Sequence, residues 1–225
     1  VGTANCAIQG FTLADGYADS TDADNENYRT SGGGVSAYQV EQASRHQVRV
    51  LDCVITNCWA ARGGGVYGTT CERTKIVNCF GSKSAQRNAK FVSCVFENTY
   101  EPNIDGQYGN GSYNGTHINC TVVGRKDNST YMLNKAGGNP LTNTIVQTTR
   151  EFKYTADCAG SIVWDVMTFD STVVEKIDPQ LAHISKGNYR LTGTSPAIGY
   201  GVAIYDPLIC WADFEGRPMN FTDGK

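Results

Sequence analysis

A short pattern that recurs along this chain constrains its fold more than any other feature. The clearest copy is VLDCVI at 50–55, where Asp52 separates Val50 from Cys53 and Ile55. Asp, Asn and Gly tolerate the left-handed backbone conformation better than other residues. Because side chains alternate along a strand, the residues two before and one and three after such a turn point to the same side. The pattern therefore predicts two short strands joined at one left-handed residue.

The same spacing recurs along most of the chain. The further turn residues are Gly10, Asn78, Ser93, Asn119, Asn143 and Gly160. From the first to the last the pattern takes six steps of about 25 residues, which is typical of solenoid repeats. Ser93 is the poorest match, and the step from Asn78 to Ser93 is too short for a full coil, so one of these two is expected to be misplaced.

The composition agrees with an all-β chain of one domain. Among 225 residues Gly is abundant, with 25, and Pro is scarce, with 6. No stretch has sustained helical periodicity. Since a continuous repeat favours a single elongated domain, we expect stacked coils over residues 1–186. The pattern then ends, and segment 187–225 is expected to be a C-terminal cap of the same domain.

Charge and hydropathy exclude several classes of function. The net charge is -3 and the basic residues are scattered, so a nucleic-acid partner is not expected. Membrane insertion is not expected either, because no run of about 20 apolar residues occurs. The first residues lack the basic and apolar regions of a signal peptide. The first strand starts at once, with no helix before it, which favours a module of a longer protein.

Nine cysteines are many for a cytosolic protein, and their odd number leaves at least one unpaired. Four share one inward position and are expected to be buried thiols in a narrow core: Cys53, Cys79, Cys94 and Cys120. Cys58 and Cys71 lie outside this position and are the best candidates for a disulfide bond. Cys6, Cys158 and Cys210 are undecided. A zinc site is not expected, because no C-x-x-C pair is present and the three histidines are not clustered with cysteines.

An acidic insertion interrupts the first coil. It carries Asp19, Asp22, Asp24 and Glu26, whose carboxylates are the kind of ligand that calcium prefers. The spacing differs from that of the EF-hand loop, and a solvated acidic loop is the alternative. The sequence therefore predicts either no cofactor or calcium bound at these residues.

Aromatic side chains outside the inward positions are candidates for a binding surface. Trp59 is expected in a loop, and Tyr67 is expected to point outward from the strand at 65–67 because Val66 points inward. The polar segment 97–115 cannot bury its three tyrosines easily. The candidates are Trp59, Tyr67, Tyr100, Tyr108, Tyr113 and Tyr131, with Asp105 as a polar partner. Tyr and Trp offer large amphipathic surfaces, which suit the apolar faces of sugar rings.

No set of catalytic residues is evident. The N-T-D, D-D, G-H-G and R-I-K elements of polygalacturonase-type hydrolases do not occur. His117 falls at an inward position, so it is expected to be a packed core histidine. Glycoside hydrolysis needs two carboxylates flanking the scissile bond, and nothing in the sequence pairs the candidates Asp105, Glu151 and Asp165.

Several motifs repeat along the chain or close it. They are N-C-x-[IFV] in the coils, G-G-G-V at 32–35 and 63–66, N-Y-R-L-x-x-x-S-P-A-I at 188–198 and D-x-x-G-R-P at 213–218. These motifs resemble those of the right-handed parallel β-helix proteins that bacteria secrete, the pectate-lyase-like group. The resemblance covers nearly the whole chain. It implies an all-β fold, a single-stranded right-handed parallel β-helix of about seven coils with an irregular C-terminal cap, and an extracellular or cell-surface location.

The same architecture serves lyases, hydrolases, adhesins and binding modules, so the resemblance specifies fold better than function. We favour a non-catalytic carbohydrate-binding module, part of a larger multidomain enzyme, because the chain's size and missing catalytic motifs are similar to those of β-helical modules attached to xylanases. Xylan is the favoured ligand, since a neutral polymer needs no basic groove. The alternatives are a lyase or hydrolase of pectin-like or xylan-like polymers, in which Arg62 or Arg73 would act with calcium, and a bacterial surface adhesin.

Overall fold

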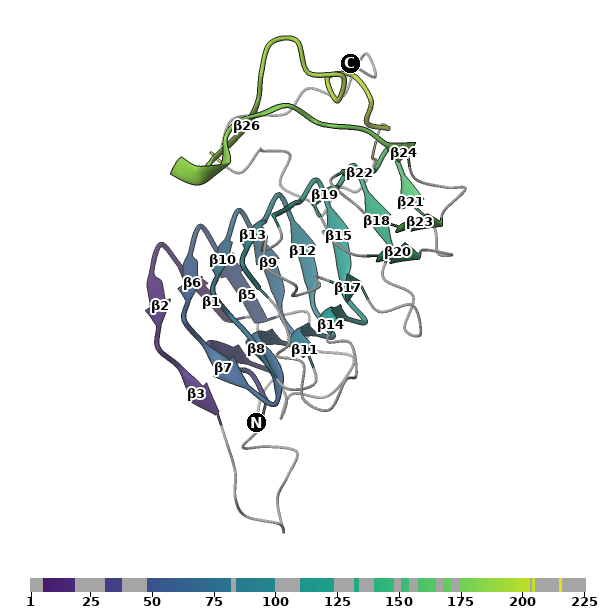
Figure 1. Ribbon diagram of the computed structural model, residues 1–225. Coiled ribbons are helices and arrows are strands. Elements are labelled where there is room, and N and C mark those ends of the chain that lie inside the picture. The colour runs from purple at the N-terminus through teal and green to yellow at the C-terminus, as the bar shows by residue number, and fades with distance from the viewer. Residues whose placement is uncertain are drawn as a thin grey trace.

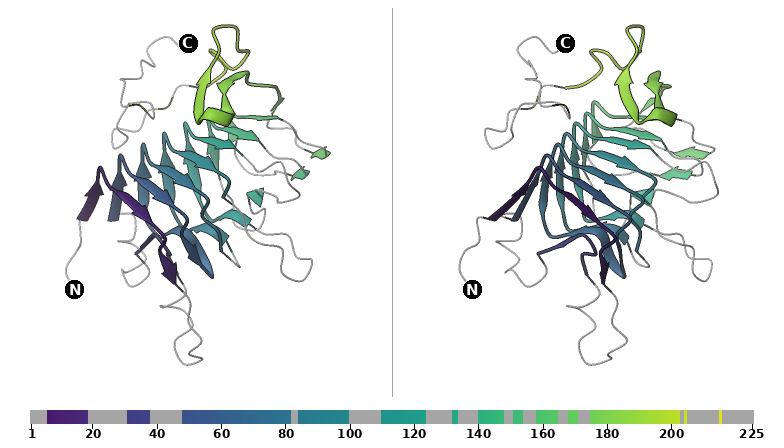
Figure 2. Two further views of the ribbon diagram at one scale, coloured as in Figure 1. Left: turned by 60° about the vertical axis from the view of Figure 1, so that its left-hand side comes forward. Right: turned by 90° about the vertical axis from the view of Figure 1, so that its left-hand side faces the viewer.

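The chain folds as a parallel β-helix, in which short strands wind into coils that stack along one axis (Figure 1). The computed structural model describes residues 6–18, 31–37, 48–81, 84–99, 110–123, 132–133, 140–147, 151–153, 158–164, 168–170, 175–202, 204 and 215. The prediction of an all-β parallel β-helix is confirmed. Figure 2 shows from two further sides how equivalent strands of successive coils lie next to one another.

Three sheets of parallel strands form the sides of the coils. The first contains β1 (Cys6–Gln9), β5 (Val48–Leu51), β9 (Thr70–Glu72), β12 (Lys90–Val92), β15 (Thr116–Ile118), β18 (Leu141–Thr142) and β21 (Cys158–Ala159). The second contains β2 (Thr12–Ala14), β6 (Val54–Thr56), β10 (Lys75–Val77), β13 (Val95–Glu97), β16 (Thr121–Val123), β19 (Ile145–Gln147), β22 (Ile162–Trp164) and β24 (Glu175–Lys176). The third contains β4 (Val35–Ser36), β8 (Arg62–Tyr67), β11 (Ser84–Arg87), β14 (Asn110–Tyr113) and β17 (Met132–Leu133).

Three smaller sheets complete the described strands. Two are parallel pairs, β3 (Tyr17–Ala18) with β7 (Trp59–Ala60) and β20 (Glu151–Lys153) with β23 (Thr168–Asp170). The third is the antiparallel hairpin of β25 (Leu181–His183) and β26 (Asn188–Leu191), joined through the 3₁₀ helix η4 (Ile184–Lys186). Gly187, with φ of 69°, ends this short helix in the left-handed conformation that glycine adopts easily.

Left-handed residues form the corner between the first and second sheets, as the sequence pattern predicts. Positive φ angles occur at Gly10, Asp52, Ser93, Asn119, Asn143 and Gly160. Asn78 is left-handed as predicted, with φ of 50°, but it is the misplaced member of the Asn78 and Ser93 pair, because Arg73, with φ of 45°, holds this corner in that coil. Arginine has no intrinsic preference for a left-handed position. Its ion pair with Asp52, at 2.6 Å from Nε to Oδ1, helps hold it there.

Two further corners complete each coil. Asn78 lies at the corner after the second sheet, together with Asp15, Asn57 and Asn98, and all four have positive φ. The corner between the third and first sheets is formed by Gly68, Asn88 and Asn114. The coils whose three corners are all described therefore change direction at three left-handed residues, of which the sequence pattern predicted the first and, through Asn78, one residue of the second.

Inward side chains fill the solenoid with a continuous apolar stack. Val50, Ile55 and Val66, one from each sheet, are all 0% exposed. Further along the axis the same inward positions hold Phe91 and Phe96, whose rings meet edge to face with centroids 4.8 Å apart. Full burial of one such side chain contributes roughly 1.5–3 kcal/mol to folding. The stacking of coils is therefore driven mainly by this shared core.

In the coils after the first, where the exposed Phe11 follows Gly10, the residue after the first corner is small and donates a hydrogen bond backward. Its thiol or hydroxyl donates to the carbonyl two residues earlier at Cys53, Thr74, Cys94, Cys120, Thr144 and Ser161. Several also donate to the preceding coil, as Thr74 Oγ1 does to the Val50 carbonyl at 3.1 Å. This row satisfies carbonyl groups at the bend, where strand pairing is interrupted.

The described cysteines are free thiols, and most of them are buried. Cys53, Cys79, Cys94 and Cys120 are at most 2% exposed, which confirms their predicted place in the core. The prediction of a disulfide at Cys58 and Cys71 is wrong, because both are free and 0% exposed. Cys58 follows the second corner as Cys79 does in the next coil, and Cys71 lies inward between Val50 and Phe91 of the adjacent strands. Cys6 is an exposed free thiol and Cys158 is half-buried, while Cys210 lies outside the described residues.

Residues after β24 return along the outside of the coils, over the first corner (Figure 1). Asn143 holds this segment through two hydrogen bonds with Val202, from its own Nδ2 to the carbonyl at 2.9 Å and from the Val202 amide to its Oδ1 at 2.8 Å. Ile204 packs on Val92 and Ile118, which point outward from the first sheet. These contacts bury apolar groups that would otherwise lie exposed on the outer face.

We predict that the second corner tolerates glycine but not a β-branched residue. Asn57 is exposed and has φ of 54°, so a substitution there tests backbone conformation with little change in packing. Asn57→Val should lower the free energy of unfolding by about 1–2 kcal/mol, whereas Asn57→Gly should change it little. Urea unfolding of both variants measures the difference. Equal stability of the two would contradict a required left-handed corner.

Candidate binding surface

Three aromatic side chains lie side by side on the outside of successive coils. Tyr17 pairs with Trp59 in the small sheet of β3 and β7, and Trp59 forms a parallel bridge to Phe80. The rings of Tyr17 and Trp59 are stacked, with centroids 4.7 Å apart and planes inclined by 18°. Tyr17 is 70% exposed, and the other two are half-buried. We call Tyr17, Trp59 and Phe80 the aromatic row.

The local sequence explains why these rings point outward. Each aromatic residue follows a second-corner residue by two positions, in the triplets Asp15-Gly16-Tyr17, Asn57-Cys58-Trp59 and Asn78-Cys79-Phe80. The middle residue is small and faces the interior, so strand alternation sends the third residue outward. The spacing continues in Asn98-Thr99-Tyr100, of which Tyr100 lies outside the described residues.

The sequence-based candidates included one described member of this row. Trp59 was expected in a loop, but it lies in β7. Tyr17 and Phe80 were not predicted. The sequence does contain a pattern that could have identified them, an aromatic residue two positions after Asp or Asn. This pattern predicts an outward ring only if Asp or Asn is already known to form the second corner.

A second row crosses the outer face of the third sheet. Tyr67, Arg87 and Tyr113 are partners in successive strands. The Arg87 guanidinium carbon lies 4.2 Å from the centroid of the Tyr113 ring, a cation–π contact. Asn88 Nδ2 donates a hydrogen bond to the Tyr67 hydroxyl at 3.1 Å. We call Tyr67, Arg87 and Tyr113 the tyrosine–arginine row.

The predicted exposure of Tyr67 is wrong. Its side chain points outward, opposite to Val66, yet the residue is only 5% exposed. Alternation fixes the side of the sheet on which a residue lies, whereas its exposure depends on what covers that side. Tyr113 is half-buried, as its neighbour Arg87 is.

The remaining predicted site residues lie outside the described part of the chain. They are the binding candidates Tyr100, Asp105, Tyr108 and Tyr131, and the calcium candidates Asp19, Asp22, Asp24 and Glu26. Among the residues that are described, no three side chains of His, Cys, Asp or Glu gather closely enough to hold a metal ion.

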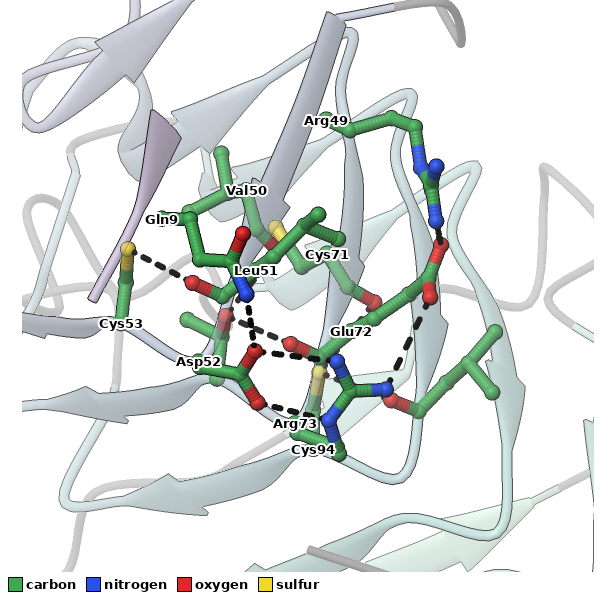
Figure 3. A network of polar contacts seen from close by, with 12 residues as sticks. Gln9, Arg49, Val50, Leu51, Asp52, Cys53, Cys71, Glu72, Arg73 and Cys94 are labelled. Carbon is green, nitrogen blue, oxygen red and sulfur yellow. Dashed lines mark hydrogen bonds and ion pairs between the residues drawn. The ribbon is translucent and has the colours of Figure 1, made fainter. Parts of the chain in front are cut away.

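Charged side chains form a network on the outside of the first sheet and its corner (Figure 3). Arg73 donates to Asp52 at 2.6 and 3.0 Å, and Gln9 donates to the same carboxylate at 3.0 Å. Arg49 Nη2 donates to Glu72 at 2.6 Å. The hydrogen bonds from Arg73, and to a smaller extent that from Gln9, hold the pKa of Asp52 below its ordinary value. This network ties three successive coils together.

A second charged cluster joins the C-terminal hairpin to the second sheet. Lys75 Nζ lies 2.9 Å from Glu97 and 5.3 Å from the centroid of the Tyr189 ring. Burial favours the neutral form of Glu97, but the adjacent Tyr189 hydroxyl and Lys75 outweigh it and lower the pKa of Glu97. Burial, followed by the Glu97 carboxylate, raises the pKa of Tyr189. Glu97 therefore stays ionised beside its cation.

His117 is a core residue, as predicted. It is 0% exposed and packs between Phe91 and Phe96, with ring centroids 5.0 and 5.4 Å away. Burial lowers the pKa of His117 to about 3, because the imidazolium form loses its hydration. The side chain is therefore neutral at physiological pH. The exposed His183 lies in β25, and His46 lies outside the described residues.

Comparisons of the chain with protein-family models, curated proteins and solved structures found no match. In the described part of the chain, no helix has the length and apolar character that crossing a bilayer requires. The fold defines the chain as a parallel β-helix protein, and function is inferred from the two outward rows.

We predict that His117 makes the protein sensitive to acid. Its pKa in the folded state is about 3, below the ordinary 6.5, so the unfolded chain binds a proton first as the pH falls. Stability is therefore unaffected by this group above pH 6.5 and declines by about 1.4 kcal/mol per pH unit below it, toward pH 3.

His117→Leu should remove this contribution, since Leu141 already occupies the same inward position in the next strand. Thermal unfolding at pH 7 and pH 4.5 compares the two proteins. If the melting temperatures of the wild-type protein and His117→Leu fall equally from pH 7 to pH 4.5, His117 is not the source of the acid sensitivity.

Proposed function

We propose that this protein is a non-catalytic carbohydrate-binding module that binds plant cell-wall polysaccharide. The observation that carries the proposal is the stack of Tyr17 on Trp59, with Tyr17 70% exposed. Sugar rings present flat faces of C–H groups, which pack well on exposed aromatic rings. A soluble domain has little other reason to hold a flat aromatic surface toward water.

The aromatic row is suited to bind without large rearrangement. Trp59 supports one face of the Tyr17 ring, so the ring loses little conformational freedom when a ligand packs on it. Strand pairing of β3 with β7 fixes both backbones. Asp15 and Asn57, two residues before these rings, are exposed and supply hydrogen-bonding groups for sugar hydroxyls.

Four of the described carboxylates are held in ion pairs, which favours binding over catalysis at those positions. Asp52, Glu72, Glu97 and Glu215 each lie within ion-pair distance of a lysine or arginine of the chain itself. A glycoside hydrolase needs one carboxylic acid that donates a proton and a second carboxylate that acts as base or nucleophile. These four carboxylates are engaged in contacts within the chain, which leaves them less suited to such a role.

Xylan is the proposed ligand, because Arg49, Arg73 and Lys75 are paired with carboxylates of the chain itself and a neutral polymer backbone needs no row of unpaired cations. The proposal places the protein outside the cell, as part of a larger enzyme that acts on plant cell walls, similar to the β-helical modules attached to xylanases. A binding module of this kind raises the local concentration of its enzyme on an insoluble polymer.

We predict that Tyr17→Ala weakens binding to xylan about tenfold, the effect of losing roughly 1.4 kcal/mol of ring contact. Affinity electrophoresis in gels containing soluble xylan measures the dissociation constant. Phe11→Ala is the matched control, since Phe11 is a 62% exposed aromatic of the same coil outside the aromatic row.

Equal retardation of the wild-type protein and Tyr17→Ala, or equal losses in Tyr17→Ala and Phe11→Ala, would contradict the aromatic row as the binding surface. Release of reducing ends or unsaturated products from xylan by the purified protein would contradict a non-catalytic role.

A further inference from the structure

We propose that the tyrosine–arginine row binds the carboxylate of an acidic sugar, with Arg87 as the ligand-binding cation. This inference rests on the proposed carbohydrate-binding function and adds a ligand class to it. The polymer expected is a xylan whose neutral backbone carries uronic acid branches. The aromatic row would bind the backbone and Arg87 the branch.

Arg87 is held in a fixed orientation. Its strand partners are Tyr67 on one side and Tyr113 on the other, and its guanidinium lies 4.2 Å from the Tyr113 centroid. Tyr67 is itself held by the hydrogen bond from Asn88. A guanidinium fixed in this way loses little freedom on binding a ligand, which favours affinity.

Arg87 differs from three other arginines of the described residues. Arg49, Arg73 and Arg190 each donate two hydrogen bonds to a carboxylate of this chain: Arg49 to Glu72, Arg73 to Asp52 and Arg190 to Glu215. Within the described part of the chain, Arg87 has the Tyr113 ring and no carboxylate. Its Nε is buried without a hydrogen-bond acceptor. The buried Nε cannot reach an external ligand, so a bound anion would contact the terminal Nη groups of this cation.

The surroundings favour an acidic sugar as the source of that anion. Arg87 and Tyr113 are both half-buried, so each residue keeps part of its surface accessible. A uronic acid unit carries a carboxylate for the planar guanidinium and a flat C–H face for the tyrosine ring. This pair of groups matches the pair formed by Arg87 and Tyr113.

The two rows share coils, and Trp59 and Tyr67 lie eight residues apart in one of them. Strand β8, which carries Tyr67, follows β7, which carries Trp59, with only Ala61 between them. The proposal requires a branched polymer that extends from the aromatic row along β8 to the tyrosine–arginine row. The aromatic row then binds the neutral backbone of the polymer, and the tyrosine–arginine row binds the carboxylate of its branch.

The test compares two forms of one polymer, glucuronoxylan and the same glucuronoxylan after chemical reduction of its carboxyl groups. Affinity electrophoresis measures both dissociation constants at low salt. The wild-type protein should bind the native polymer about tenfold more tightly than the reduced one, the size expected for one charge-assisted pair. This preference should shrink in 0.5 M sodium chloride, because the Debye screening length is then roughly a third of that in dilute buffer.

Arg87→Met should abolish the preference and leave binding of the reduced polymer unchanged. Arg87→Lys should keep part of the preference, because it retains the charge without the planar fork. Arg190→Met is the matched control, since Arg190 is an exposed arginine that is already paired with Glu215. It should keep the full preference. Melting temperatures of the variants verify folding.

The outcomes separate the two proposals. Binding of both polymers with equal affinity by the wild-type protein overturns the role of Arg87 but leaves carbohydrate binding intact, and this comparison needs no variant. An undiminished preference in a folded Arg87→Met protein also overturns it. Failure to bind either polymer overturns the proposed function itself.

Discussion

The structure depends on one local constraint, the left-handed residue at each corner of the coil. It reverses the outward and inward alternation of the strands on either side, so that inward side chains of all three sheets meet in one core. Beyond the first coil, where Phe11 is exposed, the residue that follows is small, because it lies at the inside of the bend. At the first corner a thiol or hydroxyl there also satisfies a carbonyl two residues earlier. Backbone geometry, core packing and hydrogen bonding thus impose the same spacing on every coil.

The same constraint creates the surface features to which we assign function. A residue two positions beyond the second corner must point outward, and in successive coils it stacks on its equivalent at the spacing of paired strands. Where that residue is aromatic, as in Tyr17 and Trp59, the rings lie face to face at 4.7 Å. The third sheet forms the tyrosine–arginine row by the same rule. A repeating backbone therefore turns a repeated residue into a continuous surface.

Charged residues take part in this repetition in a different way. Asp52 and Arg73 occupy equivalent corners of adjacent coils, so the stacking distance brings their side chains into contact. Arg49 and Glu72 lie on neighbouring strands of the first sheet and pair in the same manner. Because these pairs join neighbouring coils, they favour one register between them, which a purely apolar core specifies poorly. Arg87 interrupts this scheme, since its strand neighbours are tyrosines.

The sequence by itself determined the solenoid, the first corner and the inward positions, including the buried Cys94 and His117. These features follow from local backbone preference and alternation, which act over a few residues. Tertiary structure decided that Arg73 occupies a left-handed corner against its conformational preference. It also decided which outward side chains are exposed, since Tyr67 points outward and is nevertheless buried. It also assembled Tyr17, Trp59 and Phe80, which insertions separate by irregular distances in the chain. The physical reason is that ion pairing, coverage and stacking between coils join residues about 20 to 40 positions apart, beyond the reach of a local pattern.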